Sequence, residues 1–242
     1  MTGETASITG KNRIRDTFTG SNSDANILYL SDSANGDALF MDDIYSEFGD
    51  AARLSLIREV RAGAGDDVVD VTTERYAGIP GVAVNGMTVR GGAGDDVLWG
   101  AGYNQKFFGD DGNDWIVGSA ADDVIAGGAG NDTLAGGGGK DTFAFGGNWG
   151  SDVVSQTATG SVILWFETGD LSNWDASTLT YTDGANSVKV SGVAADKVAL
   201  KFGDDGSAQY KTLAAAGAFL ESTAEAVFET EAARQTGILA SL

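Results

Sequence analysis

Six nine-residue units follow one another without an insertion between Gly91 and Ala144. They read GGAGDDVLW, GAGYNQKFF, GDDGNDWIV, GSAADDVIA, GGAGNDTLA and GGGGKDTFA. The sixth position is Asp in every unit but one, where Gln105 stands, and the eighth position is always Leu, Ile or Phe. A fixed short period predicts a repeat architecture, in which each unit contacts only its neighbours. The chain is therefore expected to form an elongated stack over this region.

Partial copies of the unit occur on both sides of the array. AGAGDDVVD occupies residues 62–70, and GNWGSDVV at 147–154 reads as a seventh unit shifted by two residues. The stack is thus expected to extend beyond the six regular units.

Each unit is predicted to be a tight turn followed by a short strand. Gly at the first, second and fourth positions permits positive φ and close approach of the backbone, as a turn around an ion requires. The eighth side chain points inward because side chains alternate across a strand. One unit buries nothing alone, whereas stacked units form a parallel β-solenoid with a continuous apolar core.

The acidic side chains of the array have few basic partners. Residues 91–144 contain nine Asp, no Glu and two Lys, a net charge of −7. Carboxylates stacked at the strand spacing of about 4.8 Å, or a small multiple of it, repel one another. Calcium relieves such repulsion, since it accepts about six to eight carboxylate and carbonyl oxygens. Calcium binding and folding are therefore expected to be one event.

Composition excludes several classes of function. The 242 residues include no Cys and no His, which removes disulfides, thiolate chemistry, zinc sites built on these residues and a Ser-His-Asp triad. A net charge of −20 argues against binding of nucleic acid. The glycine-rich turns lack the third Gly of a dinucleotide motif, and Gly139-Lys140 is followed by Asp141 rather than Ser or Thr, so a P-loop is also excluded. Paired acids such as Asp95-Asp96 fall in the ion-binding period, which favours ion binding over glycosidase chemistry. We therefore predict a protein that is not an enzyme.

The repeats match the pattern G-G-x-G-x-D-x-U-x, and residues 62–144 resemble RTX (hemolysin-type calcium-binding) β-rolls. The resemblance implies an all-β fold, a right-handed parallel β-roll (β-solenoid), in which two consecutive units make one turn. It also implies that each ion lies between units two apart. Its ligands would come from the second, fourth and sixth positions of one unit and from the first, third and sixth of the other, with side chains used only at the sixth.

Carried over to this sequence, the resemblance implies about three well-formed calcium sites. The implied ligands of the first site are Gly92, Gly94, Asp96, Gly109, Asp111 and Asp114. Those of the second are Asp110, Gly112, Asp114, Gly127, Ala129 and Asp132. Those of the third, on the opposite edge, are Ser119, Ala121, Asp123, Gly136, Gly138 and Asp141. A fourth site would include Gln105 and is expected to be weak or empty, because an amide brings no charge. Asp67 is a further candidate ligand, but the ions near Asp67 and Asp152 are not assigned because the period breaks beside both.

The rest of the chain divides into flanking regions. Residues 1–61 contain β-like segments such as NILYL (26–30) and are expected to be degenerate or capping rungs of the solenoid. The roll itself is predicted at 62–154, with an insertion at 71–90 that contains Pro80. Residues 155–206 alternate strand-like segments with turn signals such as Asp183-Gly184. The Ala- and Glu-rich tail at 207–242 is predicted to be an amphipathic helix.

The tail has two compatible interpretations. It can cap the end of the roll, and it resembles the uncleaved C-terminal signal of substrates of the type I secretion machinery. The start, MTGETASITG, lacks a basic region followed by an apolar one, so no cleavable secretory signal is expected. No apolar run reaches the roughly 20 residues that a membrane span needs. These features together favour type I export to the extracellular space or the cell surface.

Alternating side chains place an apolar row on one outer face. Positions seven and nine of three units read Val97/Trp99, Trp115/Val117 and Thr133/Ala135. Either the flanking regions 1–61 or 153–206 cover this row, or it is an interface for self-association or a surface polymer.

The favoured function is a secreted calcium-binding protein with a structural or assembly role at the cell surface or in the extracellular matrix. The alternative is the non-catalytic RTX module of a larger toxin, adhesin or secreted enzyme, and the resemblance of 37–70 to large RTX surface proteins is compatible with both.

Overall fold

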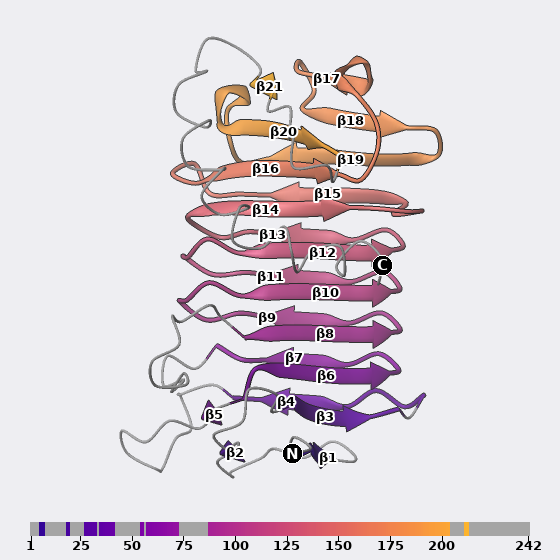
Figure 1. Ribbon diagram of the computed structural model, residues 1–242, viewed down its shortest axis with the longest axis vertical. Coiled ribbons are helices and arrows are strands. Elements are labelled where there is room, and N and C mark those ends of the chain that lie inside the picture. Colours follow the sequence, from indigo (N-terminus) through magenta and orange to yellow (C-terminus); the bar gives the residue numbers. More distant parts are fainter. Residues whose placement is uncertain are drawn as a thin grey trace.

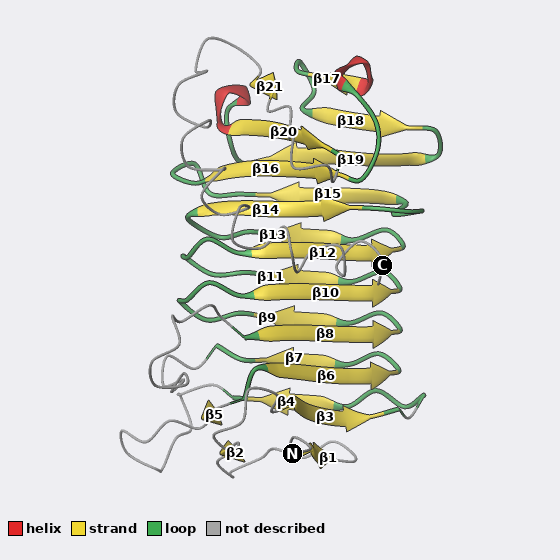
Figure 2. Cartoon of the chain, in the orientation of Figure 1, coloured by secondary structure: helices red, strands yellow, loops and turns green. Residues whose placement is uncertain are grey.

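Two β-sheets stacked face to face form the body of the protein (Figures 1 and 2). The structure is a computed structural model, and it describes residues 5–7, 18–19, 27–32, 34–41, 54–55, 57–72, 87–203 and 211–212. The chain crosses from one sheet to the other at each turn and so climbs the stack from bottom to top in Figure 1. This is a β-roll, and the predicted all-β fold class is confirmed.

The first sheet, sheet I, carries the longer strands of the roll. Among the described residues it has ten strands, and all pairs but the last are parallel. In spatial order they are β1 (Thr5–Ser7), β3 (Ile27–Ser31), β6 (Glu59–Ala64), β8 (Thr88–Ala93), β10 (Lys106–Asp111), β12 (Val124–Ala129), β14 (Lys140–Phe145), β16 (Ser161–Phe166), β20 (Val198–Phe202) and β21 (Lys211–Thr212).

The second sheet, sheet II, faces sheet I with shorter strands. Its nine described strands are, in spatial order, β4 (Ala38–Phe40), β7 (Val68–Asp70), β9 (Val97–Trp99), β11 (Trp115–Val117), β13 (Thr133–Ala135), β15 (Ser151–Ser155), β19 (Asn186–Ser191), β18 (Thr180–Asp183) and β17 (Trp174–Asp175). The last three pair antiparallel, and the others pair parallel. A separate parallel pair joins β2 (Phe18–Thr19) to β5 (Leu54–Ser55).

The register of the array is a shift of two units for each turn of the roll. Ile116 pairs with Leu98 below it and with Leu134 above it, and Phe107 pairs with Ile125, so partners in both sheets are 18 residues apart. Two nonapeptides therefore make one turn, as the resemblance implies. The turns of odd-numbered units stack on one edge of the roll and those of even-numbered units on the other.

The eighth positions fill the space between the sheets. Leu98, Ile116 and Leu134 from sheet II and Phe107, Ile125 and Phe143 from sheet I are all 0% exposed. Each fully buried side chain of this size contributes about 1.5–3 kcal/mol. The row continues beyond the array in both directions, because Val60 and Leu164 occupy the corresponding places in β6 and β16.

The core ends in an aromatic cluster at the C-terminal end of the described roll. Phe166 stacks on Tyr181 with ring centroids 3.9 Å apart, and on Phe145 at 5.1 Å. Trp149 and Phe202 complete the cluster. The hairpin of β18 and β19 lies over it and turns at Asp183-Gly184, as the turn signal predicts. Two 3₁₀ turns, η1 (Leu171–Asn173) and η2 (Ala195–Lys197), join neighbouring strands, and among the described residues no helix is long and apolar enough to cross a membrane.

Several predictions on the flanking regions meet the structure only in part. The predicted segment at 26–30 contributes residues 27–30 to β3, and β3 and β4 pair in register with β6 and β7 as further rungs. Both sheets continue past residue 154, since β14 pairs with β16 and β15 with β19. Of the predicted insertion, 73–86 lie outside the described residues and Thr88–Arg90 belong to β8. The helix predicted at 207–242 also lies outside them, except for the two residues of β21.

The apolar row on the outer face of sheet II is open to solvent. Trp115 is 50% exposed and Val153, one rung beyond the row, is 46% exposed. The interpretation that the flanking regions cover the row is therefore wrong at Trp115. Of the flanking regions, the described strands β3, β4 and β19 continue the stack.

Truncation of one core side chain tests the stacking. We expect Ile116→Ala to lower the free energy of unfolding by about 2–5 kcal/mol, because Ile116 is fully buried between two neighbours of similar size. Urea denaturation at a fixed calcium concentration measures the change. Thr133→Ala, at an exposed position of the next strand, is the control and should alter stability by less than about 0.5 kcal/mol. Equal effects of the two variants would contradict the assigned core.

Candidate metal sites

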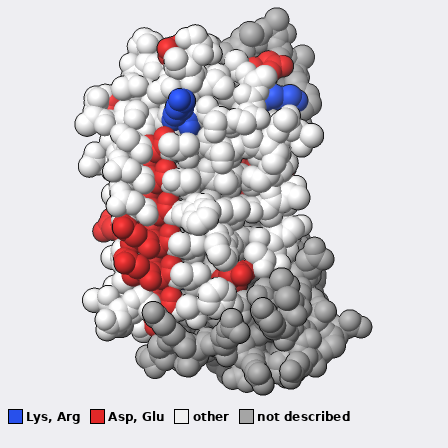
Figure 3. Space-filling model, turned by 180° about the vertical axis from the view of Figure 1, so that it is seen from behind, with Lys and Arg blue, Asp and Glu red and all other residues white. Residues whose placement is uncertain are grey.

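A column of buried carboxylates follows one edge of the roll. We call the turns that lead from sheet I to sheet II the first edge, and five of the aspartates on it the Asp ladder: Asp67, Asp96, Asp114, Asp132 and Asp152. Each is between 1% and 3% exposed. Seen from behind, acidic side chains form a vertical stripe along the molecule (Figure 3).

Hydrogen bonds join the members of the Asp ladder from rung to rung. The backbone N–H of each Asp donates to Oδ1 of the Asp one turn further along the chain. The donor–acceptor distances are 2.8 Å from Asp67 to Asp96, 2.9 Å from Asp96 to Asp114, 2.9 Å from Asp114 to Asp132 and 2.8 Å from Asp132 to Asp152. One oxygen of each of the four acceptor carboxylates is therefore fixed by the backbone of the rung below.

The other oxygen is the feature that points to a cation. Oδ2 of all five ladder aspartates is buried and has no hydrogen-bond partner. A buried anionic oxygen without a partner is strongly destabilising, and an oxygen-seeking cation supplies the missing interaction. No basic side chain forms an ion pair with a ladder aspartate in the part of the chain that the structure describes.

Backbone carbonyls surround these carboxylate oxygens. A Cβ at Gly112 would collide with the carbonyl oxygen of Gly94 in the turn below, and one at Gly128 would collide with that of Asp110. A Cβ at Gly109 would collide with both Asp114 Oδ2 and the carbonyl oxygen of Gly127. The glycines thus leave room for oxygens from two successive turns. Among the described residues no three carboxylates converge. Carboxylate and carbonyl oxygens lie together at these turns, a mixture that calcium accepts.

The structure brings together the residues of the first two predicted sites. Gly94 N–H donates to the carbonyl of Asp111 at 2.8 Å, and Gly112 N–H donates to that of Ala129 at 2.8 Å, so the paired turns are in contact. The Asp110 carboxylate contacts Arg90, from which it accepts two hydrogen bonds at 2.8 and 3.2 Å. The backbone of Asp110 has a positive φ of 76°, and the residues one rung below and above, Gly92 and Gly128, also have positive φ. The Asp110 carbonyl oxygen, which the second predicted site would use, faces Gly128 in the turn above.

The residues of the third predicted site meet on the second edge, formed by turns from sheet II to sheet I. Asp123 N–H donates to Asp141 Oδ1 at 2.7 Å, and Gly138 N–H donates to the carbonyl of Ser119 at 2.6 Å. Here both carboxylates have partners for Oδ2. Asp123 Oδ2 accepts from the backbone and hydroxyl of Ser119 at 2.7 and 3.1 Å, and Asp141 Oδ2 accepts from the side-chain amide of Gln156.

Gln105 occupies the place of an Asp at the start of this edge. Its Oε1 accepts from Ala101 N–H at 2.6 Å, and its own N–H donates to Asp123 Oδ1 at 2.8 Å. Among the described residues of the second edge, the two buried aspartates Asp123 and Asp141 thus lie between two glutamines, Gln105 and Gln156. The weak site expected at Gln105 stays a prediction, and the contact of Gln156 with Asp141 is one that the sequence did not suggest.

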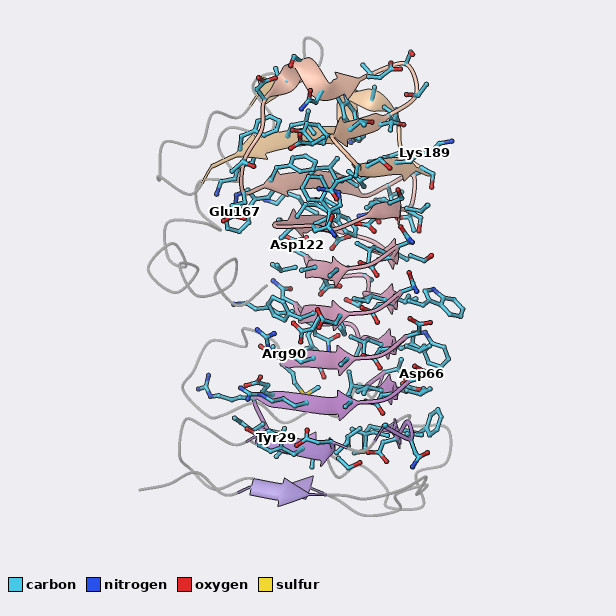
Figure 4. All side chains as sticks on the ribbon, turned by 90° about the vertical axis from the view of Figure 1, so that its right-hand side faces the viewer. Tyr29, Asp66, Arg90, Asp122, Glu167 and Lys189 are labelled. Carbon is cyan, nitrogen blue, oxygen red and sulfur yellow. The ribbon has the colours of Figure 1, made fainter. Side chains whose placement is uncertain are left out.

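A second row of side chains was also missed. Fifth-position residues Asp66, Asp95, Asn113 and Asn131 are exposed on the first edge, and each accepts at Oδ1 the backbone N–H one turn above, at 2.7–3.0 Å. Figure 4 shows Asp66 on this edge, with Tyr29 and Arg90 on the other side of the ribbon. The recurrence of Asp or Asn every 18 residues at 95, 113 and 131 was a signal that could have revealed it.

Burial without a cation raises the pKa of the ladder carboxyls. Desolvation, opposed by the backbone hydrogen bonds, raises the pKa of Asp96 to about 7 and that of Asp114 to about 8, and repulsion from neighbouring aspartates adds to both shifts. The same causes raise the pKa of Asp152 to about 8. On the second edge burial raises the pKa of Asp123 to about 6 and that of Asp141 to about 7.

The fold and the buried carboxylates define a β-roll suited to hard divalent cations. The family model of the RTX calcium-binding nonapeptide repeat matches the chain in four copies, at residues 88–102 and 108–143. No curated protein matches the chain. The protein thus contains an RTX calcium-binding repeat domain, a non-catalytic β-roll region whose aspartates form a ladder.

Alanine at a turn glycine tests the oxygen cradle. Gly109→Ala places a Cβ against Asp114 Oδ2 and the Gly127 carbonyl, so we expect it to raise the calcium concentration at the folding midpoint by about tenfold, or about 1.4 kcal/mol. Gly102→Ala is the control, because a Cβ there meets no atom within 4 Å. Circular dichroism during a calcium titration measures both, and an equal shift in the two variants would contradict the cradle.

The raised pKa values predict how the calcium-free protein responds to pH. Carboxyls in an unfolded chain have a pKa near 4, so the folded form binds protons more tightly than the unfolded form. This stabilisation is complete below about pH 4 and is lost as the pH rises through about 6 to 8. In EDTA we therefore expect more β-structure at pH 5.5 than at pH 8.5, as measured by circular dichroism. Greater β-structure at the higher pH would show that the ladder carboxyls are not buried in the calcium-free chain.

Proposed function

We propose that this protein is a secreted calcium-binding β-roll that folds when it meets calcium outside the cell, and that it has a structural or assembly role at the cell surface or in the extracellular matrix. The observation that carries this proposal is the row of five buried, unpartnered Oδ2 atoms on the first edge. A folded roll without cations leaves every one of them unsatisfied, whereas a roll with cations does not.

The coupling of binding to folding follows from the charge. The ladder aspartates come together only in the folded state, so the unfolded chain has no preformed site. Binding to the folded state alone shifts the equilibrium toward it by mass action. Where calcium is scarce, repulsion within the ladder favours the unfolded chain, and where calcium is abundant the roll is favoured.

This switch suits export in an unfolded state. RTX repeats are typical of extracellular proteins secreted by the type I route, and the Ala- and Glu-rich tail at 207–242 resembles the signal read by that machinery. Low calcium inside the cell keeps the repeats unfolded for passage, and the higher concentration outside folds them. Extracellular calcium modules bind with dissociation constants of about 10⁻⁴–10⁻³ M.

The outer face of sheet II supports a role in assembly. Trp99 and Trp115 meet edge to face with centroids 6.2 Å apart, and Trp115 and Val153 are about half exposed. Exposed apolar groups gathered on one face of a protein are typical of an interface. Self-association or binding to a surface polymer through this face is consistent with a structural role.

A second candidate function is supported by the extent of the repeats. The recognised repeats occupy only residues 88–102 and 108–143, and such arrays serve as non-catalytic modules of larger toxins, adhesins and secreted enzymes. In that case the roll would bind calcium in the same way, and another part of the protein would carry the activity. Calcium-triggered assembly of this chain alone favours the first function.

Calcium titration tests the proposed function directly. In EDTA at pH 7.5 we expect a largely unfolded circular dichroism spectrum, and calcium should produce a β spectrum with a midpoint of about 10⁻⁴–10⁻³ M. Magnesium at equal concentration should fail, because it prefers a smaller octahedral shell and keeps its waters. Sedimentation of the calcium-bound sample then reports assembly. A chain that is already folded in EDTA and does not respond to calcium would overturn the proposal.

A further inference from the structure

The Asp ladder is longer than the regular array. Inside the array its members are 18 residues apart, but Asp67 precedes Asp96 by 29 residues and Asp152 follows Asp132 by 20. The recognised repeats begin at residue 88 and end at residue 143, so Asp67 and Asp152 both lie outside them. The spacing in sequence changes at both ends, whereas the geometry of the ladder does not.

The turn around Asp67 reproduces the turns of the array. Gly65 N–H donates to the carbonyl of Ala93 at 2.7 Å, the counterpart of the bond from Gly94 to Asp111 one turn above. A Cβ at Gly92 would collide with the carbonyl oxygen of Gly63, and one at Gly94 with that of Gly65. These carbonyls therefore face the next turn, as those of Asp110 and Gly112 do inside the array.

The turn around Asp152 does the same at the other end. Gly150 has a left-handed φ of 78°, and a Cβ on it would collide with the carbonyl oxygen of Gly130 in the turn below. Asp132 N–H donates to Asp152 Oδ1 at 2.8 Å, the distance found between Asp67 and Asp96. The two extra residues between these turns are thus absorbed before Gly150, and the ladder contact is kept.

Asp67 and Asp152 also each have a carboxylate oxygen without a protein partner. Asp67 is 1% and Asp152 is 3% exposed, and the Oδ2 of each is buried without a hydrogen-bond partner. Carboxylate and carbonyl oxygens gathered at a buried position select a hard divalent cation.

We infer that two cation sites lie outside the nonapeptide array, one between the turns of Asp67 and Asp96 and one between those of Asp132 and Asp152. Together with the two gaps between Asp96, Asp114 and Asp132, the first edge then holds four sites bounded by five aspartates. The inference rests on the proposed binding of calcium by the array. It adds that calcium also binds between rungs that are joined by segments of irregular length.

The ends of the ladder support this extent. Below Asp67, Asp37 N–H donates to Asp67 Oδ1 at 2.5 Å, but the carboxylate of Asp37 already accepts from the Ser31 hydroxyl at 2.5 Å. Above Asp152, the neighbouring Gly150 N–H donates to Asn186 Oδ1 at 3.1 Å, and the antiparallel hairpin begins. At the lower end the ladder hydrogen bond is kept, but the Asp37 carboxylate has a hydroxyl partner, and at the upper end the accepting side chain is the neutral Asn186.

Counting bound ions tests the inference. Equilibrium dialysis of the full chain at saturating calcium, with circular dichroism on the same samples, gives the number of ions per folded chain. We expect Asp67→Asn and Asp152→Asn each to lose one ion, because each bounds one of the four sites, and Asp114→Asn to lose two. Asn keeps Oδ1, so the hydrogen bond from the rung below remains possible in each variant.

Two controls carry the same change of charge. Asp66→Asn alters the exposed neighbour of Asp67, at a position where the chain already has Asn113 and Asn131 one and two turns above Asp95. Asp196→Asn lies in the exposed turn η2, away from the ladder. Both should bind as many ions as the wild type. If Asp67→Asn and Asp152→Asn also keep the wild-type number, the inference is overturned, whereas a wild type that binds no calcium overturns the proposed function itself.

A measurement on the wild type covers variants that fail to fold. Crystals grown with calcium and then soaked with a lanthanide give anomalous peaks at the bound ions. Peaks beside Oδ2 of Asp67 and of Asp152 are expected, in addition to those between Asp96 and Asp132. Peaks confined to the gaps between Asp96 and Asp132 would overturn the inference and leave the calcium-binding array intact.

Discussion

The hydrogen bond from a buried aspartate's backbone to the carboxylate one turn above organises the roll. It sets the register of each rung, because Asp96 can reach Asp114 only when the two turns are stacked. The stacked turns also bury the carboxylates close to one another. Desolvation, with repulsion from neighbouring aspartates, raises the pKa of Asp114, although the backbone hydrogen bond opposes this shift. The same contact that orders the turns thus creates the charge that a cation has to balance.

The two edges of the roll meet this constraint differently. On the first edge the chain leaves one oxygen of each ladder aspartate without a protein partner. On the second edge the Ser119 hydroxyl and the Gln156 amide contact those oxygens, and Gln105 removes one charge altogether. The first edge therefore leaves more carboxylate oxygens without a protein partner than the second, although both are built from the same nonapeptide.

What the sequence predicts well is what repeats. The eighth-position side chains, the turn glycines and the two units per turn all recur at a fixed spacing, so Ile116 and Asp114 could be placed before any coordinates were known. The contacts that depend on a single loop could not be predicted from the sequence. The steps of 29 and 20 residues to Asp67 and Asp152 carry no period, and the approach of Gln156 to Asp141 depends on how the chain leaves β15.

Because each rung of the array pairs only with the rungs directly below and above it, the continuous core of the roll is built from contacts between neighbouring rungs. Asp114 lies between two gaps of the ladder, so an event at one gap is felt at the next and fades beyond it. Adding or removing one rung would therefore lengthen or shorten the roll without changing the contacts of distant rungs.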